Sequence, residues 1–260
     1  MKKYLIVLAG FMLAVASASA QQSAPKAAPA KALPRTADGH PDLSGIWQAG
    51  GVSLFGETGE AVPSAAGAGA TPRPKREAPP YQDWALAKVK QLNADAAHAP
   101  GAQCLLPGPV VATGWPMPYE IVQNAKKTYI LYEAMHAFRI IPTDGRPHPK
   151  DLDPTYMGDS TGRWEGDTFV VDAIGFNDKT WLDGNGHFHS EDLHLTERYT
   201  LNADQTITYV AIAEDPKVLT KPWTVTTLTL RHPPRDERIM EYECAQNNLD
   251  VPYLVNQAQK

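Results

Sequence analysis

The sequence predicts a mainly β protein whose antiparallel strands follow one another as a meander and close into a barrel or a curved half-barrel. From Tyr119 onward, short runs rich in β-branched and aromatic residues alternate with polar turn signals. About nine such runs occupy roughly 125 residues, and no helical pattern separates them. Strands joined by short turns pair antiparallel, so a closed meander follows most simply. A β-sandwich is the alternative.

The first 20 residues have the composition of a secretory signal peptide. Lys2 and Lys3 precede the apolar run Tyr4–Ala16, and the small residues Ala18–Ala20 follow it. This run is short for a membrane-spanning helix. We expect cleavage near Ala20, a periplasmic or secreted protein, and no membrane insertion of the mature chain.

The next part of the chain is expected to hold few regular elements. Residues 21–34 are rich in Ala and Pro and predict a flexible tether. The composition of residues 35–118 predicts a loop-rich N-terminal region, with a long Gly-, Ala- and Pro-rich loop at 50–80. Spaced prolines in residues 100–118 favour an irregular path over the surface.

One helix is expected in this region, near residues 83–97. Its apolar residues recur at imperfect helical spacing. They are Trp84, Leu86, Val89 and Leu92.

Residues 119–260 are expected to form the barrel core, as one domain with residues 35–118. The expected strands are separated by turn signals, of which Glu165-Gly166-Asp167 is the clearest hairpin. They are Glu120–Gln123, Thr128–Glu133, Ala137–Ile141, Thr161–Trp164, Thr168–Ile174, Leu193–Leu201, Thr206–Ala213, Thr224–Leu230 and Arg238–Cys244.

The charge balance of the chain is acidic. Cleavage near Ala20 removes two of the 24 basic residues and none of the 29 acidic ones, which lowers the formal net charge from −5 to −7. With no Lys/Arg cluster, nucleic acid and anionic membrane surfaces are not expected as partners. The chain also lacks a P-loop and a dinucleotide fingerprint, so no nucleotide cofactor is expected. The oligomeric state stays open.

Cys104 and Cys244 are the only cysteines of the chain. In an oxidising compartment, two cysteines far apart in sequence most simply form one disulfide. A catalytic thiol is the alternative, and the residues around the two cysteines give it little support.

Three phrases are specific enough to suggest relatives. They are DGRPHP at Asp144–Pro149, GRWEGDT at Gly162–Thr168 and GFNDKTWLD at Gly175–Asp183. Together with other phrases along the mature chain, they resemble a largely uncharacterised family of exported bacterial proteins, which implies no established activity. The Trp-Glu-Gly-Asp-Thr hairpin also looks like part of the calycin-type barrels, lipocalin-like or nitrobindin-like.

The densest group of chemically active residues is His187, His189 and Glu191. On an extended strand, side chains at positions i, i+2 and i+4 lie on the same face. A neutral imidazole can act as a general base or bind a metal, and a carboxylate can assist either role. His187 and His189 are therefore candidate catalytic residues, and with Glu191 they are candidate ligands of a single divalent metal. A structural role without chemistry is the alternative.

The preceding loop and a second turn add further candidates. Asp178 is a candidate catalytic residue, because Asp178 or Asp183 can orient an imidazole or abstract a proton. Asp183 and Trp181 are candidate substrate-binding residues, and Trp181 can stack on a ring. His148 lies in a turn fixed by two prolines and is a second acid–base candidate. Ordinary turn and capping roles are the alternatives.

Three residues complete the expected substrate-binding set. Arg146 follows an Asp-Gly turn, and Arg139 lies between apolar neighbours on a predicted strand. Either guanidinium can hold a carboxylate or phosphate. Tyr156 lies in a loop and can shape a pocket.

The leading hypothesis is an exported enzyme that acts on a small organic molecule by His/Asp acid–base chemistry, most plausibly a lyase, a hydratase or a hydrolase. The cofactor is expected to be absent or a single divalent metal held by His187 and His189. A non-catalytic carrier or sensor, with a small apolar ligand held in the barrel interior, is the alternative, and it predicts an enclosed, mostly apolar cavity with the histidines outside it.

Overall fold

The structure, a computed structural model, describes residues 32–49, 77–93, 99–234 and 237–244. Contacts between Cα atoms divide the chain into Met1–Ala30 and Lys31–Lys260, and every described residue belongs to the second unit. The expected signal peptide with its cleavage point, most of the tether and most of the Gly-, Ala- and Pro-rich loop therefore lie outside the described residues.

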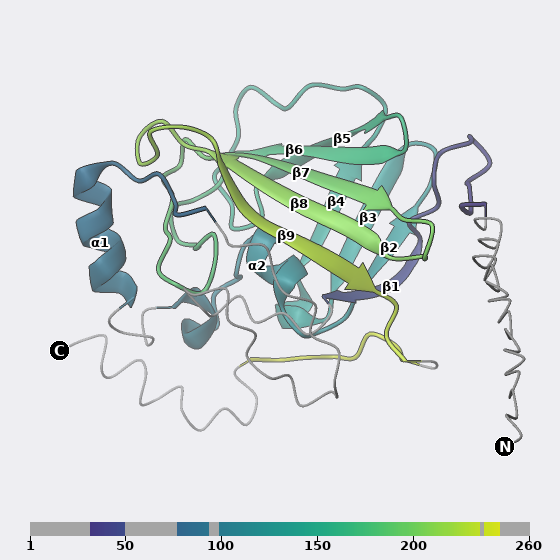
Figure 1. The fold of residues 1–260 in the computed structure, drawn as a ribbon, viewed down its shortest axis with the longest axis horizontal. Coiled ribbons are helices and arrows are strands. Elements are labelled where there is room, and N and C mark those ends of the chain that lie inside the picture. The colour runs from purple at the N-terminus through teal and green to yellow at the C-terminus, as the bar shows by residue number, and fades with distance from the viewer. Residues whose placement is uncertain (1–31, 50–76, 94–98, 235–236, 245–260) are drawn as a thin grey trace, which may run out of the picture. The chain divides into compact units, whose positions relative to one another are not determined.

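An antiparallel sheet of nine strands dominates this unit (Figure 1), in the order β4-β3-β2-β1-β9-β8-β7-β6-β5. The strands are β1 (Gly45–Ala49), β2 (Tyr119–Gln123), β3 (Lys127–Tyr132), β4 (Phe138–Pro142), β5 (Asp159–Glu165), β6 (Thr168–Ile174), β7 (His194–Leu201), β8 (Ile207–Glu214) and β9 (Trp223–Arg231). The edge strands β4 and β5 approach each other without a hydrogen-bonded ladder, which nearly closes the sheet into a barrel. The expected mainly β fold with an antiparallel barrel is confirmed.

One expected strand is wrong, and another strand takes its place. Residues 238–244 are not a strand, whereas β1 pairs with both β2 and β9 and joins two meanders. Because β8 and β1 occupy both edges of β9, no edge is left for a further hairpin partner. The C-terminal segment is held instead by Met240, whose backbone N–H donates to Glu133 at 2.9 Å, and by the disulfide.

Helix α1 (Asp83–Asn93) begins where the sequence predicts, but only Val89 and Leu92 of the expected apolar stripe pack on the core. Ala85 and Val89 are buried, whereas Trp84 and Leu86 are 54% and 39% exposed. The buried pair is spaced four residues apart, so it lies on one helix face. The indole of Trp84 is therefore not part of the core.

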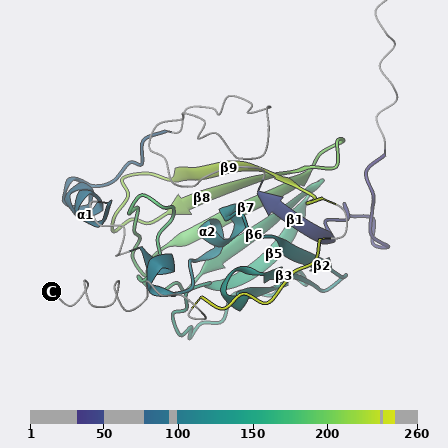
Figure 2. The same ribbon diagram turned by 90° about the horizontal axis from the view of Figure 1, so that it is seen from below.

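Residues 100–118 were expected to run irregularly over the surface, and this expectation is wrong. They contain the short 3-10 helix η2 (Pro100–Gln103) and the helix α2 (Pro109–Gly114), whose residues are all buried. Proline suits the first turn of a helix because its missing N–H has no helical partner there. The apolar residues that follow in α2 pack against β1 inside the curve of the sheet (Figure 2).

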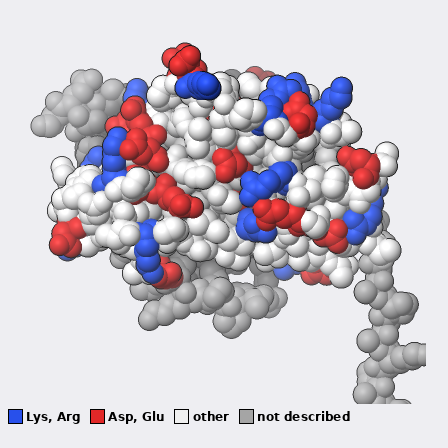
Figure 3. Space-filling model, turned by 90° about the horizontal axis from the view of Figure 1, so that it is seen from above, with Lys and Arg blue, Asp and Glu red and all other residues white. Residues whose placement is uncertain are grey.

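On the face shown in Figure 3, acidic and basic side chains are interspersed over the described part of the surface. Exposed ion pairs link neighbouring strands and turns, such as Arg198 with Glu165 at 2.8 Å and Arg35 with Asp167 at 3.0 Å. Such exposed pairs contribute little to stability but keep the surface mixed in charge.

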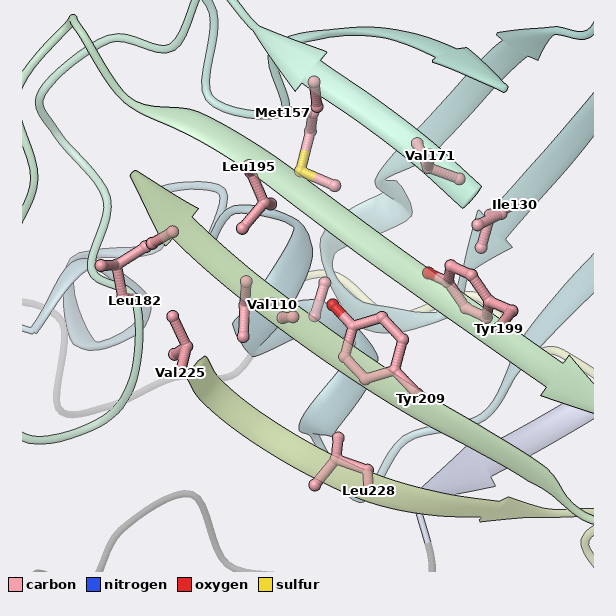
Figure 4. Close-up of a cluster of buried hydrophobic side chains, with 14 of the residues drawn as sticks. Val110, Ile130, Met157, Val171, Leu182, Leu195, Tyr199, Tyr209, Val225 and Leu228 are labelled. Carbon is pink, nitrogen blue, oxygen red and sulfur yellow. The ribbon is translucent and has the colours of Figure 1, made fainter. Parts of the chain in front are cut away.

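The inner face of the sheet forms the hydrophobic core. Residues alternate strictly between buried and half-buried along β7, as expected for a strand with one face inside. Figure 4 shows Leu195, Tyr199, Tyr209 and Leu228 from three adjacent strands on this inner face, with Val110 of α2 among the same cluster. The barrel interior is thus filled by side chains.

Candidate functional site

The segment between β6 and β7 carries most of the predicted site residues. It folds back on itself, with an isolated bridge between Trp181 and Phe188 and a 2.7 Å hydrogen bond from the Leu182 N–H to the His187 carbonyl. Leu182 and Phe188 are buried and fix the segment to the core. The polar residues on either side of them are thereby placed in different surroundings.

Asp183 and His187 form a hydrogen-bonded dyad. Asp183 is 2% exposed, and both of its carboxylate oxygens lie 2.8 Å from His187 Nδ1. A carboxylate only accepts, so Nδ1 carries the proton and Nε2 of a neutral ring keeps its lone pair. The ring is stacked on Tyr81 and lies edge-on to Trp223, with centroids 5.8 and 5.4 Å away. The arrangement fixes both the orientation and the tautomer of the imidazole.

His189 is turned into the protein, away from this dyad. It is 2% exposed; its Nδ1 donates to the Ser190 carbonyl at 2.9 Å, and its Nε2 accepts from the Thr180 hydroxyl at 2.6 Å. Burial lowers the pKa of His189 below its ordinary value, so the ring is neutral. Both ring nitrogens are already used by the fold.

The residues proposed as metal ligands have separate surroundings. His187 contacts Asp183, His189 contacts Thr180, and Glu191 is exposed. Within residues 32–49, 77–93, 99–234 and 237–244, no three His, Cys, Asp or Glu side chains come together in a group that could hold a metal ion. The divalent metal stays a prediction.

A polar groove of about 520 Å³ opens beside this segment. Among the described residues it is lined by Trp84, Lys88, Asp178, Phe188, His189, Ser190, Glu191, Lys217 and Val218. Three predicted site residues, Asp178, His189 and Glu191, therefore share one concavity. Trp84 and Lys88, which come from α1, were not predicted as site residues.

A second, apolar cavity of about 470 Å³ lies on another side of the same segment. Its described lining is Leu92, Asn93, Ala99, Pro100, Gly101, Ala102, Pro107, Val111, Trp115, Pro116, Met117, Met135, Trp181, Asp183, Gly184 and Tyr242. Trp181 and Asp183 are the two predicted site residues in this lining. The others come from segments far apart in sequence, and no short motif indicates that they meet.

The predicted disulfide closes one wall of this cavity. Cys104 and Cys244 are bonded, and they lie next to η2 and to Tyr242, which both line the apolar space. The disulfide prediction is confirmed. It joins two segments that no sheet pairing holds together.

Arg139 lies inside the barrel and is already paired. Its Nη2 lies 2.5 Å from Glu197 Oε2 and donates to Ser160 Oγ at 2.8 Å. Burial acts to lower the pKa of Arg139, but the Glu197 carboxylate outweighs it and raises that pKa well above its ordinary value. The hydroxyls of Tyr209 and Tyr199 donate to Glu197 Oε1 at 2.9 and 3.2 Å. Residues of β7 alternate between the outside and the inside of the sheet, and this alternation turns Glu197 inward. The same alternation is visible in the sequence, but Glu197 was not predicted as a buried partner of Arg139.

His148 lies on the outer face of β5 to β7 and lines neither concavity. Its Nδ1 lies 2.5 Å from Asp159 and its Nε2 lies 2.9 Å from Asp172, which also accepts from His194 at 2.7 Å. Burial lowers the pKa of His148, but the hydrogen bonds to the two carboxylates outweigh it and raise the pKa above 6.5. The residue clamps its loop to the sheet.

The last two predicted residues lie away from both concavities. Arg146 is exposed and forms an ion pair with Asp144, two residues earlier in the same turn, at 2.5 Å. Tyr156 is half-buried before β5. Neither is among the described residues that line the groove or the cavity.

No protein-family model, no curated protein and no solved structure matches this chain. Among the described residues, the longest apolar helical stretches fall short of what crossing a membrane requires. The features of the molecule that bear on its function are therefore the two concavities and the His187–Asp183 dyad.

Proposed function

We propose that this protein binds a small, largely apolar ligand in the 470 Å³ cavity, as a carrier or sensor rather than as an enzyme. The apolar cavity is the observation that supports this proposal most strongly. Its volume lies within the range of small-molecule sites, and such sites are mostly apolar with a few polar groups that set orientation. Trp115, Trp181 and Tyr242 supply flat faces, while Met117 and Met135 supply flexible ones.

The positions of the predicted catalytic residues support binding over catalysis. Of the candidates Asp178, His148, His187 and His189, none is in the described lining of the apolar cavity. Asp183 is in the lining, but its carboxylate is occupied by His187 and by the Asn185 N–H at 2.9 Å. A ligand in this cavity therefore meets mainly aromatic rings, thioethers and aliphatic side chains.

The test is a titration of the mature protein with the fluorescent probe N-phenyl-1-naphthylamine. We expect saturable binding that Met117→Lys weakens by at least about ten-fold, because a charge in an apolar cavity costs free energy. Met240→Lys is the matched control, since Met240 is 61% exposed and outside the cavity. Equal weakening by both variants, or no saturable binding by the wild type, contradicts the proposal.

Acid–base catalysis by His187 is a second candidate function, favoured by the dyad. A buried carboxylate that orients an imidazole is how general bases are held in many enzymes. Nε2 of His187 has no hydrogen-bond partner among the described residues and so can take a proton. The role would suit a lyase, a hydratase or a hydrolase.

A metabolite-turnover screen tests this second candidate. If it holds, the wild type consumes a small molecule, and His187→Gln removes the turnover while probe binding in the apolar cavity is unchanged. A Glu214→Gln control keeps full turnover, because Glu214 is exposed and lines neither concavity. Turnover that survives His187→Gln excludes the dyad as its source.

A further inference from the structure

The polar groove has an aromatic platform that the core does not need. Trp84 stands on α1 with 54% of its surface exposed, while Ala85 and Val89 of the same helix are buried. Its Nε1 donates to Gln82 at 3.1 Å, which holds the indole in one orientation. An exposed, oriented indole at the edge of a 520 Å³ groove is available to a ligand.

The floor of the groove continues this aromatic surface. The Phe188 ring lies 6.0 Å from the indole of Trp84 and is tilted by 59° to it. Lys88 Nζ lies 4.0 Å from the centre of the Phe188 ring, within cation–π range. The ammonium is thus held at the groove while its hydrogen-bond donors remain available.

The rim carries both hydrogen-bond donors and acceptors, with charged groups of both signs. Asp178 and Glu191 supply carboxylates that have no ion-pair partner among the described residues. Lys88 and Lys217 supply ammonium groups, and Lys217 also pairs with Asp192 at 2.9 Å. Ser190 adds a hydroxyl, which donates to Asp215 at 2.9 Å.

We propose that this groove binds a neutral saccharide. A sugar ring has one face of C–H groups, which can stack on the Trp84 indole, and a rim of hydroxyls that both donate and accept. The hydroxyls can donate to Asp178 and Glu191 and accept from Lys88, and charge-assisted hydrogen bonds of this kind are stronger than neutral ones.

Other classes of ligand fit the groove less well. A basic peptide would meet the like charges of Lys88 and Lys217, and an acidic ligand would meet Asp178 and Glu191. A purely apolar ligand would bury these four charges without hydrogen bonds, which is costly. A neutral, polyhydroxylated ligand with one apolar face satisfies both the platform and the rim.

Calorimetric titration of the mature protein with chitotetraose, cellotetraose and maltotetraose tests this inference. At least one should bind saturably, with an affinity changed by less than about two-fold between about 50 and 500 mM NaCl, because the ligand is uncharged. Trp84→Ala should weaken binding by at least about ten-fold, and Trp84→Phe by less, since a smaller ring remains.

Phe138→Ala is the matched control, because Phe138 is 62% exposed on β4 and outside the groove. The thermal midpoint of each variant verifies folding. The inference is overturned if none of the three sugars binds, if Trp84→Ala binds as the wild type does, or if tetralysine binds more tightly than every sugar. Because N-phenyl-1-naphthylamine probes the apolar cavity separately, a failure of the proposed apolar-ligand binding can be distinguished from a failure of the saccharide inference.

Discussion

Asp183 and His187 show how one buried carboxylate sets the state of a neighbouring imidazole. The two residues are four apart in sequence, and the short loop between them, with the N–H of Asn185 on the same carboxylate, brings the side chains to 2.8 Å. Proximity in sequence made this pair predictable. His189 and Glu191 were grouped with it on the assumption of an extended strand, but the Phe188 N–H donates to the Gly186 carbonyl at 2.8 Å, so the chain turns tightly at His187.

The His148 clamp predicts a loss of stability at alkaline pH. The folded-state pKa of His148 is raised above 6.5, so the protonated ring stabilises the fold fully below that value. This contribution is lost as the pH rises through the folded-state pKa. Urea unfolding should show a larger decrease in the free energy of unfolding between about pH 6 and about pH 9 for the wild type than for His148→Gln. Equal decreases in the two proteins contradict the clamp.

The Arg139–Glu197 pair predicts a strong asymmetry between single and double variants. Both side chains are buried, at 3% and 0% exposure. Glu197→Gln leaves a guanidinium without its counter-charge and should lower the free energy of unfolding by about 3–5 kcal/mol. Replacing both, as Arg139→Met with Glu197→Leu, should cost clearly less, measured by urea unfolding. A single variant that costs under about 1 kcal/mol would show that the pair is dispensable.

At the scale of elements, periodicity predicted the strands from β2 to β9 and failed at β1 and α2. Alternating burial along most of these strands leaves a trace in the sequence, as in β7. β1 begins at a glycine and its residues, Gly-Ile-Trp-Gln-Ala, do not alternate between apolar and polar, so it lacks this trace. α2 is a short helix buried on all sides, and a fully buried helix has no amphipathic pattern.

Gly162 on β5 has no room for a larger side chain where the edge strands β4 and β5 approach each other. A Cβ there would lie 2.7 Å from the Phe169 ring and 2.9 Å from Ile141 of β4. Gly162→Ala should therefore lower the free energy of unfolding by about 1–3 kcal/mol, through overpacking. Gly145→Asn is the control, because its surroundings are open and asparagine tolerates its φ of +77°. If Gly162→Ala leaves the free energy of unfolding unchanged, there is room for a methyl group between β4 and β5.

At the scale of the whole molecule, the apolar cavity depends on segments that only the complete fold brings together. Trp115, Met135, Trp181 and Tyr242 come from four separate stretches of the chain. No spacing rule connects them, so the sequence predicted the type of fold and the reactive segment but not the cavity. The Cys104–Cys244 pairing was predictable because the chain has no other cysteine.

The disulfide predicts a link between redox state and ligand binding. It spans 140 residues and holds Tyr242 at the cavity wall, where the residues from 237 to 244 have no sheet partner. Cys104→Ser with Cys244→Ser should lower the free energy of unfolding by about 3–5 kcal/mol on the chain-entropy model. Probe affinity should decrease in the same variant under conditions where circular dichroism shows it folded. Unchanged affinity would mean that Tyr242 does not shape the site.

A crystal structure grown with N-phenyl-1-naphthylamine tests the central claim most directly. We expect the probe to lie in the apolar cavity, in contact with Trp181 and Tyr242. The Arg139–Glu197 pair should be intact inside the barrel, which side chains fill. A probe bound between the strands of the barrel, or only on the exposed face around Phe138 with the cavity empty, would contradict it.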